Sequence, residues 1–143
     1  MRDRIEAAVF SACILLFIAA TLWASTAGAT TWHQTGASVF GVPCDASEFT
    51  GYRGASFAQN PWTFAELGMG TAMGGLPNHA RIRVQDPRSH RQITLVKNDI
   101  GLGGGAVGGY RRTLDVLWPA LHRLLRGRAN CSWTGVLKWR RLR

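Results

Sequence analysis

The sequence lacks the cysteine and histidine spacings that usually hold a metal ion. Its three cysteines form no C-x-x-C pair, and its four histidines form no H-x-x-x-H pair. Structural and catalytic zinc sites depend on such closely spaced ligands. We therefore expect no metal site and no cofactor. The chain also has no internal repeat and no long linker.

Acidic residues are scarce, and none follows Asp115. The chain carries 8 acidic and 17 basic residues, which gives a formal net charge of +9. The first 30 residues hold two of each sign, so the excess belongs to the rest of the chain, which ends in the basic stretch LKWRRLR. Basic surfaces bind anionic membranes, anionic cell-wall polymers or nucleic acid. The alternative is a solvated face without a specific partner.

A glycine run in KNDIGLGGGAVGGYRRTLDV (97–116) matches G-x-G-x-x-G at Gly103, Gly105 and Gly108. A dinucleotide site also needs a helix that begins within the motif and an acidic residue about twenty positions later. Here the strand-like YRRTLDV follows, and the acidic residue is missing. We therefore expect no nucleotide binding.

The N-terminal segment 1–29 predicts a signal peptide. Two arginines precede an apolar run over 7–24, and the small-x-small pattern Ala27-Gly28-Ala29 suits cleavage after Ala29. An uncleaved membrane anchor is the alternative, because an 18-residue run just spans a bilayer. Either case places residues 30–143 outside the cytoplasm, secreted or in the cell envelope, where nucleic acid is the least expected partner. Disulfides persist there, so we predict a Cys44–Cys131 bond.

Hydrophobic periodicity predicts one domain over 30–143, made of short strands with one or two short helices. Alternating residues predict strands at GASVFG, ARIRVQDP, RQITLVKND, RTLDV and WTGVLKWRRL. The segment 61–68 predicts a helix that begins at Pro61 and ends at Gly68. A second helix is expected in VLWPALHRLLRG, with Pro119 in its first turn and Gly127 at its end. Such a pattern is typical of a compact, mainly β barrel.

Four stretches in order resemble the rare lipoprotein A-like proteins and expansins. GASVFG (36–41) is similar to their G-x-A-S-W-Y-G, and LPNHARIRVQDP (76–87) to L-P-x-G-T-x-V-x-V-T-N. VKNDIG (96–101) is similar to V-x-V-N-D-R-G-P, and RRTLDV (111–116) to G-R-x-I-D-L-S. The resemblance implies a six-stranded double-psi β-barrel over nearly all of 30–143. It also implies a monomer that acts on or loosens a cell-wall glycan such as peptidoglycan.

The sequence departs from that pattern at several places. His79 stands where the family has glycine after L-P-x, and Val39-Phe40 replace its tryptophan-tyrosine pair. The D-R-G-P turn is the longer DIGLGGG, which lacks the proline. These changes bear on the specific activity more than on the fold.

The resemblance places a catalytic acid at Asp115 and a second acid at Asp99. Apolar neighbours would desolvate the Asp115 carboxyl and raise its pKa, which suits a general acid. A lytic transglycosylase needs only one acid, because a hydroxyl of the sugar itself attacks. Two structural alternatives stay open: Asp115 caps the helix that follows, and Asp99 is an ordinary turn aspartate.

The same resemblance suggests residues that would line a glycan groove. Glycines allow close approach of a sugar and positive φ, so the run near Asp99 is expected to form one wall. Aromatic rings would stack on sugar faces, and a histidine lies beside the second motif. The expected substrate-binding residues are Gly103, Gly104, Gly105, Tyr110, Trp62 and His79.

Three hypotheses for the function follow. The first is an exported protein that acts on cell-wall glycan, with Asp115 as its acid. The second is a non-catalytic polysaccharide-binding module whose basic tail holds anionic polymer. The third is a secreted basic effector or inhibitor domain with a protein target.

Overall fold

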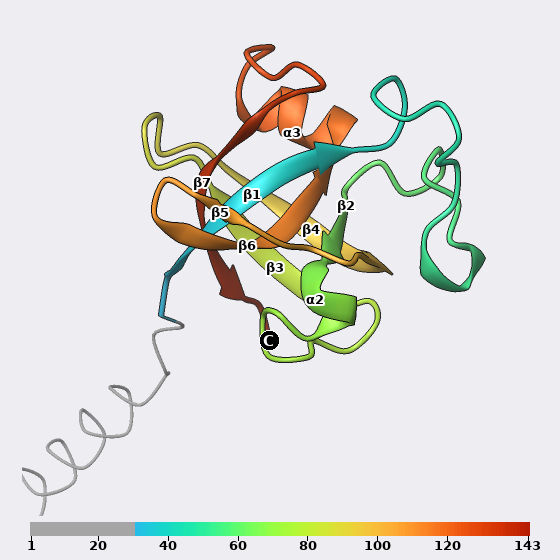
Figure 1. The fold of residues 1–143 in the computed structure, drawn as a ribbon, viewed down its shortest axis with the longest axis horizontal. Helices are drawn as coiled ribbons and strands as arrows, with labels where there is room; N and C mark the ends of the chain where they lie inside the picture. The colour runs from blue at the N-terminus through green and yellow to red at the C-terminus, as the bar shows by residue number, and fades with distance from the viewer. Residues whose placement is uncertain (1–30) are drawn as a thin grey trace, which may run out of the picture. The chain divides into compact units, whose positions relative to one another are not determined.

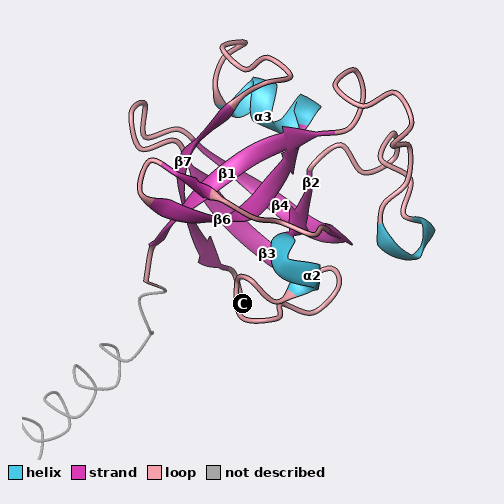
Figure 2. Cartoon of the chain, viewed as in Figure 1, coloured by secondary structure: helices cyan, strands magenta, loops and turns pink. Residues whose placement is uncertain are grey.

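The computed structural model describes residues 31–143, and strands joined by long loops make up most of that part (Figures 1 and 2). The predicted signal segment lies outside the described residues. The strands are β1 (His33–Phe40), β2 (Thr63–Glu66), β3 (Arg81–Gln85), β4 (Gln92–Ile100), β5 (Ala106–Val107), β6 (Tyr110–Leu117) and β7 (Thr134–Arg141). The helices are η1 (Tyr52–Gly54), α2 (Leu67–Gly70) and α3 (Trp118–Leu124).

Six of the strands close into a barrel. They are hydrogen-bonded in the order β1-β7-β3-β4-β2-β6, and β1 pairs again with β6 to complete the circle. The β1–β6 and β2–β4 pairs are parallel and the others antiparallel. The short β5 pairs only with β6, as a hairpin. The predicted fold class, a mainly β six-stranded barrel with short helices, is confirmed.

The barrel interior follows from strand alternation, because successive side chains of a strand point to opposite faces. In β3, Ile82 and Val84 are fully buried, whereas Arg81 and Arg83 point outward. The helix α3 lies at one end of the barrel and α2 at the other (Figure 1). The buried Ala120, Leu121 and Leu124 of α3 belong to the same hydrophobic core as β3.

The predicted helix over 61–68 is wrong, because its central four residues form strand β2. All four residues of β2 are buried, and they lie between β4 and β6 in the barrel. The chain turns only at α2, a four-residue segment from Leu67 in which Gly68 and Met69 have left-handed φ angles of 62° and 54°. Proline and glycine gave the local signals of a helix, but pairing on both sides of this central segment outweighed them.

The helix after β6 confirms one prediction and corrects another. Pro119 lies in the first turn of α3, as expected. Gly127 has φ +77° and donates its N–H to the carbonyl of His122 at 2.8 Å, which closes the chain after the helix. The N-cap residue is Leu117, and no side chain caps the helix. Asp115 therefore lies inside β6 and is not a helix cap.

Two β-bulges change the direction of side chains in the barrel. Phe64 pairs with Lys97 and Ala65 with Asp99, so Asn98 is an extra residue in β4. Likewise Gly36 pairs with Arg112 and Ala37 with Leu114, which makes Thr113 extra in β6. A bulge shifts the alternation of the strand that contains it. Lys97 therefore points inward while Asp99, two residues later, points outward.

A buried ion pair holds one end of the barrel. The Lys97 Nζ lies 2.6 Å from Glu66 Oε2, and both side chains are almost inaccessible to solvent. Glu66 also accepts backbone N–H bonds from Met73, Gly75 and Leu76. Every oxygen of this carboxylate has a partner, so its charge is compensated and the loop after α2 is fixed.

The predicted disulfide is present. Cys44 and Cys131 are bonded, with their Cα atoms 4.9 Å apart and a sequence separation of 87. The bond joins the long loop 41–62, which extends from the barrel between β1 and β2 (Figure 1), to the loop before β7. Within residues 31–143, no helix has the length and apolar character needed to cross a membrane.

Candidate functional site

Four outward-pointing residues lie side by side across β1, β6, β2 and β4. Ser38 pairs with Asp115, Asp115 with Ala65, and Ala65 with Asp99. Directly paired residues share a face of the sheet. This face is the outer one, because Leu114 and Val116 beside Asp115 are fully buried in the core. We call these residues, with Glu48 described below, the acidic row.

Asp115 is the most perturbed carboxyl of the row. Its Oδ1 accepts a hydrogen bond from the Ser38 hydroxyl. Burial raises the pKa of Asp115 to about 6; the Arg112 guanidinium lowers it in part, and the Glu48 and Asp99 carboxylates raise it further. A large fraction of Asp115 carboxyls therefore carries a proton near pH 6. The sequence predicted this direction from Leu114 and Val116, but both of these side chains point into the core, away from the carboxyl.

Asp99 lies two strand spacings from Asp115, roughly 10 Å between backbones. Burial raises the pKa of Asp99, although the N–H groups of Ile100 and Tyr52 bond to the carboxylate and lower it. The Tyr52 N–H donates to Asp99 Oδ1 at 2.8 Å from the long loop, 47 residues away. Asp99 is thus a strand residue held by tertiary contact, and the interpretation as a turn aspartate is wrong.

Glu48 is a third carboxyl, which sequence reasoning missed. Burial raises its pKa, and the Asp45 and Asp99 carboxylates raise it further. It lies in the 41–62 loop, whose sequence has no periodicity to place it over the barrel. The only available signal was its position four residues after the disulfide-bonded Cys44.

Apolar residues beside the acidic row explain the raised pKa values. Phe40, Ala65 and Leu117 point outward and form a buried cluster with Phe57 of the loop. The Phe40 and Phe57 rings meet edge to face, with centroids 5.3 Å apart. The adjoining groove has a volume of about 420 Å³. Its lining includes Val42, Glu48, Phe49, Phe57, Leu117 and Pro119.

Two of the other predicted site residues lie near the row. His79 Nδ1 is 3.1 Å from the Asn98 side chain, next to Asp99. Gly103, with φ +73°, packs so closely on the α2 backbone that an added Cβ would lie 2.8 Å from the Leu67 Cβ. Gly104 and Gly105 continue this connection in open space, and both have positive φ.

The two aromatic residues predicted to bind the substrate, Tyr110 and Trp62, lie farther from the carboxyls of the acidic row. Tyr110 begins β6, five residues from Asp115, which is roughly 17 Å along an extended strand. Trp62 precedes β2, and its carbonyl accepts the Val96 N–H at 2.9 Å. Both side chains are exposed, at 39% and 41%. They could contact only a ligand that extends beyond the carboxyls.

The chemistry available at the row is proton transfer. Within the part of the chain that the structure describes, no three histidine, cysteine, aspartate or glutamate side chains form a group able to hold a metal ion. The row combines one carboxyl whose pKa is raised to about 6 with two further acids whose pKa values are also raised. A carboxyl that still holds a proton near pH 6 suits general acid catalysis.

Comparison with known proteins assigns no family to this chain. No protein-family model and no curated protein matches the chain. Among solved structures, the chain is similar to the apo form of an expansin from Clavibacter michiganensis, with a TM-score of 0.49 and 9% sequence identity. The match covers 79% of this chain and 51% of that one, so the chain spans about half the length of the expansin.

Proposed function

We propose that this protein cleaves or loosens a cell-wall glycan, with peptidoglycan as the first candidate, and that Asp115 is its general acid. The observation that supports this most directly is the Asp115 carboxyl, which has a pKa of about 6. Two of its neighbours, Glu48 and Leu117, line the adjoining groove. The resemblance of four sequence motifs to glycan-active proteins agrees with this assignment.

The simplest reaction needs one acid. The protonated Asp115 donates its proton to the glycosidic oxygen, and the bond from that oxygen to the anomeric carbon breaks. A hydroxyl of the same sugar attacks that carbon, and its proton passes to the Asp115 carboxylate, which restores the acid. A hydrolase would need a second carboxylate to activate water. Asp99 is a poorer candidate for that role, since one of its oxygens accepts the Tyr52 N–H.

Mass spectrometry of soluble fragments released from purified peptidoglycan tests the proposal. The wild type should release anhydro-sugar muropeptides, and Asp115→Asn should lower the rate by about 10²–10⁴-fold. Asp45→Asn is the control variant, because Asp45 is an exposed carboxyl of the 41–62 loop and its hydrogen-bond partners are the N–H and hydroxyl of Ser47. Fragments that persist at the wild-type rate in Asp115→Asn would reject Asp115 as the acid.

A second candidate function is binding without catalysis. Arg81 and Arg83 of β3 and Lys138 and Arg140 of β7 point outward from neighbouring strands, and we call them the basic face. Within residues 31–143 the ion pairs are Lys97–Glu66 and Arg128–Asp86, so no acid neutralises this face. An anionic wall polymer would complement it.

Sedimentation with cell-wall sacculi distinguishes the two functions. A folded wild type that binds sacculi in a salt-sensitive way but releases no fragments supports a binding module. Binding that Asp115→Asn leaves unchanged agrees with either function. Failure to bind any glycan would favour the third hypothesis, a secreted effector or inhibitor with a protein target.

A further inference from the structure

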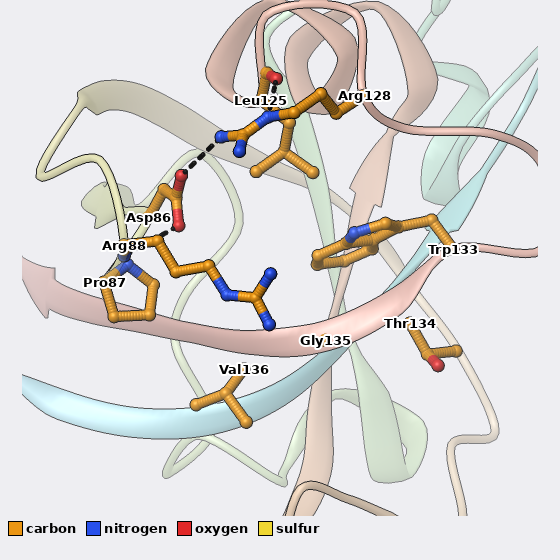
Figure 3. Close-up of a pocket in the computed structure, with 9 residues that line it drawn as sticks. All are labelled: Asp86, Pro87, Arg88, Leu125, Arg128, Trp133, Thr134, Gly135 and Val136. Carbon is orange, nitrogen blue, oxygen red and sulfur yellow. Dashed lines mark hydrogen bonds and ion pairs between the residues drawn. The ribbon is translucent and has the colours of Figure 1, made fainter.

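A second cavity lies at the rim of the barrel, away from the acidic row. It has a volume of about 330 Å³ and lies between the β3–β4 turn, the loop after α3 and the start of β7 (Figure 3). We call it the Arg88–Trp133 pocket; its lining includes Asp86, Arg88, Leu125, Arg128, Trp133 and Val136. Cavities that bind small molecules begin at about this size. A single sugar-sized group is therefore the expected occupant.

Asp86, the acidic residue of the pocket, already has hydrogen-bond and ion-pair partners within the protein. Asp86 accepts bonds from the Arg88 N–H at 3.0 Å and the Ser89 hydroxyl at 2.6 Å. Its Oδ2 also lies 3.3 Å from Arg128 Nη2, and Arg128 Nε donates to the Leu125 carbonyl. Asp86 and Arg128 thus neutralise each other and fix the pocket wall.

Arg88 supplies the remaining charge. Its side chain extends from the β3–β4 turn over β7, with the guanidinium directed toward Trp133 (Figure 3). No ion pair engages it within residues 31–143. The pocket therefore carries one uncompensated positive charge. A planar guanidinium matches a carboxylate in a bidentate arrangement, and one negative charge would balance the site.

Trp133 supplies an apolar surface next to that charge. The indole packs against the core and lies on Gly135, where an added Cβ would be only 2.6 Å from Trp133 Cζ2. Glycine at 135 thus lets the ring lie close to β7 and holds it there. A rigid aromatic ring beside a charged donor favours a ligand that is flat and apolar on one face and anionic at one edge.

We propose that the Arg88–Trp133 pocket binds an acidic sugar unit, with the sugar ring against Trp133 and its carboxylate on Arg88. This site goes beyond the activity proposed for Asp115 and does not depend on it. Thr134, at the edge of the pocket, pairs with Ser38, which in turn pairs with Asp115. Thr134 is therefore next to Ser38 of the acidic row and two strand spacings, roughly 10 Å, from Asp115.

Titration of the isotope-labelled protein by nuclear magnetic resonance tests this site. The probes are glucuronate, glucose and glucose 6-phosphate, and the signals are the Trp133 indole N–H and the Gly135 amide. Glucuronate should shift both signals with a millimolar Kd, and glucose should bind at least ten-fold more weakly. Arg88→Gln should weaken glucuronate binding at least ten-fold.

Two control variants separate this site from the rest of the molecule. Arg81→Gln removes the same charge from the basic face and should leave the Kd for glucuronate within two-fold. Asp115→Asn should also leave it unchanged, whether or not that variant loses activity. Equal binding of glucose and glucuronate, or an unchanged Kd in Arg88→Gln, would overturn the proposal. Tighter binding of glucose 6-phosphate than of glucuronate would overturn the assignment to a carboxylate.

Discussion

The acidic row and the basic face both lie on the outside of the barrel, but the charged groups of the row are shielded from water and those of the basic face are not covered by a loop within residues 31–143. The row is covered by the 41–62 loop and by apolar side chains, and burial raises the pKa of Asp115, Asp99 and Glu48. On the basic face, Arg83 and Arg140 pair directly across β3 and β7, and Arg140 lies over the Trp32 ring at 4.9 Å.

The difference shows how solvent decides the effect of like charges. Water and salt screen exposed charges, so neighbouring arginines cost little stability. Where water is excluded, a nearby like charge disfavours the ionised form of a carboxyl, so the pKa of that carboxyl rises. The loop over the acidic row is therefore as important for its chemistry as the carboxyls themselves.

Of the variants considered, removal of the disulfide should change the shielding of the acidic row the most. The double variant Cys44→Ser, Cys131→Ser releases the loop, and loss of a native disulfide costs about 2–5 kcal/mol. Urea denaturation should show that loss in the free energy of unfolding. Nuclear magnetic resonance titration should show the pKa of Asp115 moving down from about 6 toward its usual value, because water reaches the carboxyl. An unchanged pKa would mean that the loop does not desolvate the row.

Gly51→Ala should disturb the same loop by a smaller amount. A Cβ at this position would overlap the Asn98 carbonyl oxygen and lie 2.8 Å from the Phe57 ring. The loop would have to move away from β4, which weakens the bond from Tyr52 to Asp99. Overpacking of this kind costs about 1–3 kcal/mol. Gly54→Ala is the matched steric control, since a Cβ there meets nothing within 4 Å, although its φ of +78° adds backbone strain. Gly51 has φ −86°, so alanine there adds no backbone strain and any loss comes from the contacts. Thermal unfolding measures both variants, and a Gly51→Ala protein as stable as the wild type would contradict the packing of this loop on β4.

Asp115→Asn should stabilise the protein at neutral pH relative to the wild type. A raised pKa means that the protonated carboxyl favours the folded state, so its contribution is complete below about pH 3.9 and lost as the pH rises through about 6. The neutral amide avoids that loss. We expect the variant to gain about 1–3 kcal/mol on the wild type between pH 4 and pH 7.5. Urea unfolding at both pH values measures the gain. A constant difference between the two proteins would contradict the raised pKa.

Arg83→Gln should have the smallest effect on stability and a clear one on binding. Arg83 and Arg140 are half-buried, and neither forms an ion pair within residues 31–143, so replacing Arg83 removes no charge partner. We expect the free energy of unfolding to change by less than about 0.5 kcal/mol. Retention on sacculi should weaken, and its dependence on salt concentration should become less steep. Arg123→Gln, on α3 away from the basic face, is the control for the charge. If Arg83→Gln and Arg123→Gln weaken retention on sacculi equally, the polymer responds to the net charge of the protein and not to the basic face.

Local patterns predicted much of this protein because they depend on nearest neighbours. Alternation placed Ile82 and Val84 in the core, and apolar flanks indicated a raised pKa for Asp115. The predicted export indicated that Cys44 and Cys131 would pair, and they do. The β2 strand was missed because its burial comes from two partners distant in sequence, β4 and β6, which outweigh the local helix signals of Pro61 and Gly68.

The sequence by itself determined the strands of the barrel, apart from β2 and the short β5, together with the disulfide and the carboxyl of Asp115 within an apolar strand. Only the tertiary structure decided that Asp99 faces Asp115 and that Glu48 joins them. A strand without a bulge would point Asp99 to the same side as Lys97, into the barrel. The extra residue Asn98 opposite β2 reverses that direction. A bulge exists only between two paired strands, so no local pattern within either strand could have shown it.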